Sequence, residues 1–289
     1  MRPVNSQLLT VNRQLPNVNM PILTLTSDFG ISDPMLGVVK GEILKINEGF
    51  QLIDLTHEIA PFNYMQAAYQ CKTIFRNFSR ESFHLILVNL YDAKLDHLLL
   101  VKHQEQYIGL PDNGLIIMIL GGIPDEYVKL PISIKSALNI GSMVQTWIEA
   151  FSLICSGKMM NQVGEPLEQL VQRTLIKAYV SSQYIEGQVL MIDRFNNILV
   201  NITIQEFEQA RNGRRFKIVL LRDAFIEEIS ATYSDVPEGE KLARFNEAGY
   251  LEIAINKGFA APLFGLGEYG LSSSQQKRQY YQTVKIFFE

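Results

Sequence analysis

Acidic residues follow the predicted strands at positions where they could bind a nucleoside. The first predicted strand, 22–26, is followed by Ser27, Asp28, Phe29 and Gly30. Ligands of open α/β sheets bind beyond the carboxyl ends of the strands, and a carboxylate there can accept two hydrogen bonds from a ribose diol. Asp is also a common cap of a following helix. The sequence therefore allows two interpretations of Asp28, a ribose ligand or a helix cap.

Histidine and carboxylates gathered around the end of the second predicted strand, 50–55, invite comparison with metal sites. The residues concerned are Asp54, His57 and Glu58. Adjacent residues at a strand exit rarely point at one ion, and the H-E-x-x-H spacing of a zinc helix is missing, so we expect no bound metal. Phe62, slightly further on, could be an aromatic platform for a base or part of the hydrophobic core.

Turns elsewhere in the chain carry polar residues that suit a small ligand. Residues 111–115 read Pro-Asp-Asn-Gly-Leu, which is primarily a turn signal. Asp193 and Asn197 flank a polar-aromatic turn that is most simply a hairpin, yet a carboxylate and an amide also match the ammonium and carboxylate of an amino acid. In 246–261, Asn and Gly residues surround a strand end, where backbone groups can meet an adenine edge.

Strands and helices alternate in the first half of the chain. Short apolar runs are separated by segments whose apolar residues recur at helical spacing. This alternation predicts an α/β N-terminal domain with a largely parallel central sheet. The predicted strands are 22–26, 50–55, 83–88, 98–101 and 107–110, and the predicted helices are 35–47, 64–78 and 143–155.

Short strands with glycine-containing turns follow in the second half. They predict a smaller C-terminal β-barrel-like domain, with strands at 186–192, 198–202, 215–221, 250–255 and 283–288. We divide the chain into an N-terminal extension at 1–19, an α/β domain at 20–165, a linker at 166–183 and a β-barrel-like domain at 184–289.

The composition is that of a globular protein. Of 289 residues, 47% are hydrophobic and 19% charged, with a formal net charge of −4, so nothing favours nucleic acid or an anionic membrane as partner. No apolar run reaches the roughly 18 residues of a membrane span, and residues 1–19 lack the apolar core of a signal peptide. Cys71 and Cys155 are far apart, which favours buried free thiols in a reducing cytoplasm.

Taken together and in this order, the motifs resemble the S-adenosyl-L-methionine (SAM) hydroxide adenosyltransferase family, which also contains the fluorinases and chlorinases. The stretches that carry the resemblance are 26–41, 54–68, 111–115, 187–202 and 246–261. The resemblance implies two domains and a homotrimer, with each site between the N-terminal domain of one subunit and the C-terminal domain of its neighbour. It also implies SAM or adenosine as the ligand, without a cofactor.

The family cleaves the C5′–sulfur bond of SAM. Water, chloride or fluoride attacks C5′ and methionine leaves, giving adenosine or a 5′-halo-adenosine. Since a sulfonium is already a good leaving group, the protein must position the nucleophile, strip its water and hold the ribose. By resemblance, Asp28 would bind the ribose hydroxyls and Phe62 would contact ribose or adenine. The other substrate-binding positions would be Asp193 and Asn197 at the methionine head group, Phe195 in the same pocket, Asn113, and Tyr250, Asn256 and Ala260 near the adenine.

The chain departs from the hydrolytic members of the family where they activate water. They carry Asp-Pro-Gly-Val-Gly and a pair of arginines after the third strand, whereas this chain has Asn89 at the Asp position and Asp96 and His97 at the arginine positions. Their Phe-His-Gly-Arg-Asp segment corresponds to 138–143, which has neither histidine nor arginine. An amide such as Asn89 has no useful basicity, so it cannot be a general base.

Three interpretations of the chemistry stay open. Asp92, Asp96 or His97 could take over catalysis from a rearranged loop, which makes them, with Asn89, the candidate catalytic residues. The protein could instead bind SAM or adenosine without reaction, or be a trimeric scaffold that has lost ligand binding. Halide attack needs no deprotonation and stays compatible with the missing residues. The sequence thus leaves open whether the protein is an enzyme.

Overall fold

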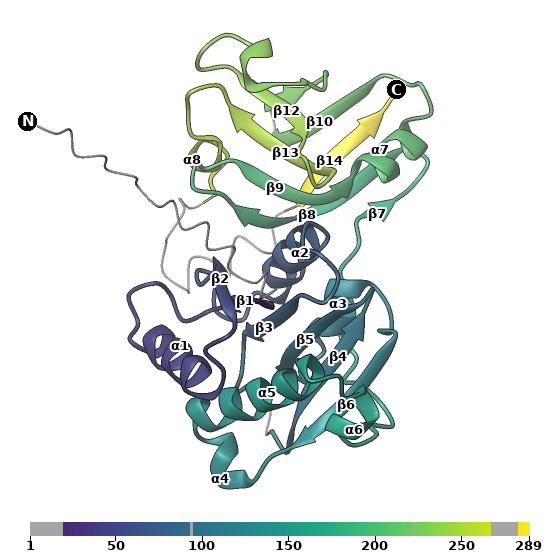
Figure 1. The fold of residues 1–289 in the computed structure, drawn as a ribbon. Coiled ribbons are helices and arrows are strands. Elements are labelled where there is room, and N and C mark those ends of the chain that lie inside the picture. The colour runs from purple at the N-terminus through teal and green to yellow at the C-terminus, as the bar shows by residue number, and fades with distance from the viewer. Residues whose placement is uncertain (1–19, 93–94, 222–223, 267–282) are drawn as a thin grey trace, which may run out of the picture.

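The structure, a computed structural model, describes residues 20–92, 95–221, 224–266 and 283–289. An α/β layer is followed along the chain by an antiparallel β domain (Figure 1). The N-terminal extension predicted at 1–19 lies outside the described residues.

A six-stranded sheet in the order β2-β1-β3-β5-β4-β6 organises the first domain. Strands β2, β1, β3 and β5 are parallel, and β4 runs opposite to both of its neighbours. The predicted α/β domain with a largely parallel sheet is confirmed, although β6 was not predicted. The strands are β1 (Ile22–Ser27), β2 (Gln51–Thr56), β3 (Phe83–Leu87), β4 (His97–His103), β5 (Gln106–Pro111) and β6 (Glu126–Pro131).

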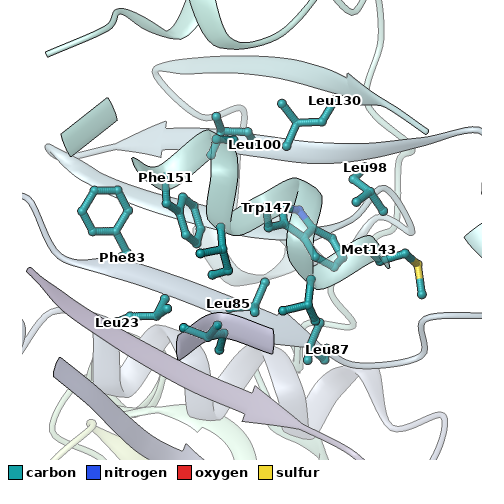
Figure 2. Packing of buried hydrophobic residues seen from close by; sticks show 14 of the residues in the cluster. Leu23, Phe83, Leu85, Leu87, Leu98, Leu100, Leu130, Met143, Trp147 and Phe151 are labelled. Atoms are coloured by element: carbon teal, nitrogen blue, oxygen red, sulfur yellow. The ribbon is translucent and has the colours of Figure 1, made fainter. Parts of the chain in front are cut away.

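Helices cover both faces of this sheet, so its strands are apolar on both sides. In and just after β3, Leu85 and Leu87 face the core beneath α1 and α5, while Ile86 and Val88 face the core beneath α2 and α3. Figure 2 shows Trp147 of α5 among the leucines of the first core. The helices are α1 (Met35–Ile46), α2 (Tyr64–Phe75), α3 (Leu115–Leu120), α4 (Ile134–Ala137), α5 (Ile140–Cys155) and α6 (Met160–Val163).

The second domain is an antiparallel sheet that curls almost into a closed barrel, which confirms the predicted barrel-like fold. Its path is β11-β10-β14-β8-β9-β13-β12, with β7 paired to β8, and a bridge between Ile229 and Ala243 brings the two ends together. The elements are β7 (Tyr179–Val180), β8 (Tyr184–Ile192), β9 (Ile198–Thr203), α7 (Ile204–Arg211), β10 (Phe216–Leu221), β11 (Ala224–Ile226), the 3-10 helix η1 (Tyr233–Asp235), β12 (Lys241–Phe245), β13 (Tyr250–Ile255), α8 (Ala260–Leu263) and β14 (Thr283–Phe288).

Helix α2 joins the two domains, and it lies directly beside β8 in Figure 1. Tyr69 of α2 meets Tyr250 of β13 edge to face, with ring centroids 5.1 Å apart. The Tyr69 hydroxyl accepts a hydrogen bond from Asn246 Nδ2 at 3.0 Å. Because α2 packs on the sheet and also contacts the barrel, it holds the two domains together.

The cysteines differ in exposure. Cys71 is buried in α2, but Cys155 at the end of α5 is exposed, so the prediction that both thiols are buried is wrong for Cys155. The last turn of α5 carries it away from the core. Within the described ranges, no helix has the length and apolar character needed to cross a membrane.

Candidate functional site

The predicted N-domain site residues gather at one edge of the sheet. Asp28 follows β1, Phe62 lies on the loop after β2, Asn89 follows β3 and Asn113 follows β5. Because these four strands are parallel, their carboxyl ends meet at the same edge. Residues up to 85 positions apart in the sequence are thus brought together by strand order alone.

Asp28 is held by the backbone of the neighbouring strand end. The Asn89 N–H donates to Asp28 Oδ2 at 2.9 Å. Burial raises the pKa of the Asp28 carboxyl, and the Asn89 N–H opposes that rise. The helix-cap interpretation is wrong, because Asp33 accepts from Met35 N–H at 2.7 Å at the start of α1. Among the described residues, Asp28 forms no salt bridge.

Asn89 connects this carboxylate to the loop after β2. Its Oδ1 accepts the Phe62 N–H at 3.0 Å, while its buried Nδ2 donates no hydrogen bond to any described residue. Both Asn89 and Phe62 have left-handed backbones, with φ of 50° and 64°. Asn tolerates this conformation, but Phe is uncommon there, and such strain concentrates at functional sites.

Phe62 does not belong to the core. Its side chain is 65% exposed, so the core interpretation of Phe62 is wrong. An exposed ring at the same edge of the sheet as the Asp28 carboxylate suits a flat ligand face.

The Asn113 side chain is hydrogen-bonded to the backbone at the end of β3. Its Nδ2 donates to the carbonyls of Val88 at 3.0 Å and Asn89 at 3.4 Å, and its Oδ1 accepts from Leu115 N–H. Since these bonds engage both ends of its amide, Asn113 holds the end of β3 in place.

Asp92 is placed one turn beyond Asn89, because its N–H donates to the Asn89 carbonyl at 3.2 Å. Its Oδ2 accepts from the Tyr64 hydroxyl at 2.8 Å and from Arg173 Nη2 at 3.0 Å. Burial raises the pKa of Tyr64 and the Asp92 carboxylate raises it further, so the phenol stays a donor. Sequence reasoning missed Tyr64 and Arg173, since Arg173 lies 81 positions away, in the predicted linker, and no local pattern marks it.

Asp96 and His97 form a separate group. Asp96 is 84% exposed on its side chain and bonds His97 Nδ1 at 2.5 Å, an interaction that lowers the pKa of Asp96. His97 Nε2 lies 3.3 Å from the buried Asp112. Among the described residues, neither side chain bonds Asp28, Asn89 or Asp92.

Of the residues first considered for metal binding, His57 lies between Ser27 and Asp54. His57 Nδ1 lies 2.8 Å from Ser27 Oγ, and His57 Nε2 lies 3.2 Å from Asp54 Oδ1. Across the described ranges, no three His, Cys, Asp or Glu side chains come together as a metal site would need.

The barrel residues form a second group at the β8–β9 hairpin. Asp193 Oδ1 accepts the N–H groups of Phe195 and Asn197, and its Oδ2 accepts Asn197 Nδ2 at 3.0 Å. The hairpin interpretation is therefore confirmed. Phe195 at its tip is 73% exposed. Ala260, which is buried, begins α8, and the next residue, Ala261, donates its N–H to the hairpin at Asn196.

Tyr250 and Asn256 stand apart. Tyr250 begins the six-residue strand β13 and Asn256 follows its end. At about 3.3 Å per residue, the Cα atoms of these two residues in one chain are roughly 20 Å apart. Tyr250 packs on Tyr69 of its own chain, whereas Asn256 Nδ2 donates to the Val236 carbonyl at 2.8 Å.

Comparison with known families covers both domains. The model described as "SAM hydroxide adenosyltransferase N-terminal domain" matches residues 23–144, and the corresponding "C-terminal domain" model matches residues 187–270.

Curated relatives include hydrolases and halogenating enzymes. An (R)-S-adenosyl-L-methionine hydrolase of Methanocaldococcus jannaschii is 29% identical over 204 residues, which are 65% of this chain and 69% of that protein. The Thermus thermophilus protein of the same name is 25% identical and covers 84% of this chain and 94% of its own length. A fluorinase of an Actinoplanes species is 24% identical over 86% of this chain and 94% of its own.

Solved structures share the fold. An uncharacterized conserved protein from Thermotoga maritima superposes with a TM-score of 0.73 at 23% identity, covering 92% of this chain and 99% of that one. A conserved hypothetical protein from Thermus thermophilus gives 0.66 at 22% identity, covering 93% and 100%.

Proposed function

This chain belongs to the SAM hydroxide adenosyltransferase family, and from that premise we propose that it binds SAM and cleaves the C5′–sulfur bond to give adenosine and methionine. The observation that carries the proposal is Asp28, a half-buried carboxylate at the carboxyl edge of β1 that neither caps a helix nor pairs with a described cation. A ribose diol supplies the two donors that such a carboxylate accepts.

The reaction asks little of the protein at the leaving group. The sulfonium takes the electron pair of the broken bond and leaves as a neutral thioether, so no general acid and no cofactor is needed. The protein has to hold the ribose, order the nucleophile and exclude bulk water. Asp28 would hold the ribose, and the exposed ring of Phe62 would cover the nucleoside.

The methionine end would bind at the hairpin that carries Asp193 and Asn197. No hydrogen bond or salt bridge among the described residues joins this hairpin to the Asp28 group, which supports a site completed by a second copy of the chain. Phe62 and Phe195 are exposed, one in each group, as expected of side chains that a neighbouring subunit covers. We therefore propose a homotrimer that acts in the cytoplasm.

A silent SAM- or adenosine-binding protein is the second candidate, and Asn89 favours it. The amide stands where the hydrolytic members carry an aspartate and cannot accept the proton of an attacking water. Ligand binding would be the same in both candidates, so only product formation separates them.

Calorimetry with SAM and with adenosine tests binding, and chromatography for adenosine and 5′-chloroadenosine, with and without chloride, tests the reaction. We expect Asp28→Ala to weaken SAM binding about 10- to 100-fold, since a charge-assisted pair of hydrogen bonds is lost. Asp33→Asn, on the same loop, is the matched control and should bind as the wild type does. Absence of heat and of a thermal shift with either ligand would leave the trimeric scaffold as the interpretation.

A further inference from the structure

The segment between α6 and β7, residues 164–178, connects the domains. This connection is hydrogen-bonded to the carboxyl edge of the sheet. Val171 N–H donates to Asp112 Oδ1 at 3.1 Å, and Arg173 Nε donates to the Asn113 carbonyl at 3.1 Å. Gly114 allows this approach, since a Cβ there would lie 2.6 Å from the Cβ of Arg173. The connection therefore delivers Arg173 to the edge where Asp28 and Asn89 lie.

The side chains of Arg173, Asp92 and Tyr64 each contact the other two. Its guanidinium carbon lies 3.7 Å from the centroid of the Tyr64 ring, while Nη2 donates to Asp92 at 3.0 Å and the Tyr64 hydroxyl donates to the same oxygen at 2.8 Å. Both donors use Oδ2. Within the described residues, Oδ1 of Asp92 makes no hydrogen bond, and the side chain is 33% exposed.

We propose that Asp92 orients the attacking water and accepts its proton, and that Arg173 and Tyr64 are the residues that position Asp92. This inference rests on the proposed function. Asp96 and His97 stand where the hydrolytic members carry arginines. Arg173, which lies in the connection between the domains, would supply the guanidinium in their place. Asp92 follows Asn89 by one turn, and Asn89 binds Asp28, so Oδ1 would face the same edge as the ribose.

The step balances without a further reactant. The water oxygen forms a bond to C5′ as the C5′–sulfur bond breaks, and the sulfur keeps that electron pair as the methionine thioether. Asp92 Oδ1 takes the proton and later releases it to solvent. SAM and water give adenosine, methionine and one proton.

Asp92 is better placed for this role than the other candidates on the loop. Asp96 is turned to solvent and bonded to His97, and His97 is bonded on both ring nitrogens. Asn89 cannot accept a proton. Asp92 alone among the four is oriented by two donors that leave its second oxygen available.

The test compares Asp92→Asn, Arg173→Met, Arg173→Lys and Tyr64→Phe in full-length protein. Steady-state formation of adenosine gives kcat and KM, calorimetry gives the Kd of SAM, and the midpoint of thermal unfolding reports folding. Glu208→Gln and Arg211→Met are matched controls, because Arg211 also pairs with a carboxylate, at 3.6 Å, and also lies over an aromatic ring, at 5.2 Å from Phe216.

We expect kcat to fall about 100-fold in Asp92→Asn and about 10-fold in Arg173→Met, with KM and Kd within about threefold of wild type. Tyr64→Phe should give a smaller fall. Arg173→Lys should recover part of the loss, because it keeps the charge but not the planar fork. If Arg173→Met fails to fold, Arg173→Lys carries the test and must still lower kcat without raising KM.

The outcomes separate the two proposals. Turnover by Asp92→Asn at the rate of Glu208→Gln overturns the role of Asp92 and leaves the proposed function intact. Binding of SAM without any turnover by the wild type overturns the inference and supports the silent binder. Absence of SAM binding overturns both.

Discussion

Asn89 is hydrogen-bonded to four residues at the carboxyl edge of the sheet. Its N–H reaches Asp28, its Oδ1 accepts from Phe62, and its carbonyl accepts from Asp92 and Asn113. An amide at position 89 therefore provides no base, but it joins the segments that follow β1, β2 and β3.

Asn89→Ala should lower the free energy of unfolding by about 2 kcal/mol, because the partly buried N–H of Phe62 loses its acceptor and Ala is strained at positive φ. Asn212→Ala is the control, since Asn212 has a similar φ of 45° but is exposed, and should cost about 1 kcal/mol. Urea unfolding measures both. Equal losses in the two variants would contradict the role given to the Asn89 side chain.

At the scale of elements, the connection between the domains and the turn after β5 act as one unit. Gly114 has a φ of 84° and lies against Arg173, whereas Gly121, at the end of α3, has a φ of 73° and nothing within 4 Å of its Cβ position. The two glycines share a backbone conformation and differ in their surroundings.

Gly114→Ala should therefore displace the connection and lower kcat about 10-fold, the fall expected for Arg173→Met. Gly121→Ala should cost only about 1 kcal/mol of stability, the strain of Ala in a left-handed backbone, and leave kcat unchanged. Product chromatography and urea unfolding on both variants provide the comparison. A Gly114→Ala protein with wild-type kcat would show that the position of Arg173 does not matter.

The pairing of β1 with β3 includes a buried histidine. His84 Nδ1 lies 2.7 Å from Thr24 Oγ1, and the ring stacks on Phe75. Burial lowers the pKa of His84 from 6.5 to about 3. Between these values the unfolded chain binds a proton that the folded protein does not, so the contribution of His84 to stability is complete above pH 6.5 and is lost as the pH falls.

The free energy of unfolding should thus fall by about 1.4 kcal/mol for each pH unit below 6.5 because of His84. Denaturant unfolding of wild type and His84→Gln between pH 7 and 4 gives the free energy of unfolding at each pH. The contribution of His84 is the difference between the two proteins in the slope of that free energy against pH. Parallel curves for wild type and His84→Gln would show that folding does not lower the pKa of His84.

At the scale of the whole molecule, the two halves of the proposed site lie in different domains and are not bonded to each other in the described part of one chain. In a homotrimer with sites between subunits, Asp28→Ala and Asp193→Ala chains should complement each other. Random mixing by co-expression leaves about one site in four with both aspartates, so SAM binding should return at about a quarter of the wild-type stoichiometry.

Light scattering should give the mass of three chains, and each variant expressed alone is the control for complementation. A mixture that binds no more SAM than the separate variants would place both halves of the site within one chain.

The sequence by itself determined the layers of this protein and its family. The short apolar runs of the strands and the helical spacing between them are local patterns, so neighbouring residues are enough to reveal them. The end of the first strand likewise marks Asp28 as a possible ligand residue. The order of motifs from residue 26 to 261 likewise identified the family, since it depends only on residue types along the chain.

The tertiary structure decided the contacts between distant residues. Only the structure shows that Asp28 does not cap α1 and that Phe62 is exposed. It also shows that the Asn113 amide is hydrogen-bonded within the protein, and that Tyr250 and Asn256 lie at opposite ends of β13. It also brought Arg173 across 81 positions to Asp92. Such a contact depends on the path of the connection over the sheet edge and on the absence of a Cβ at Gly114, and no local pattern of apolar or polar residues encodes that path.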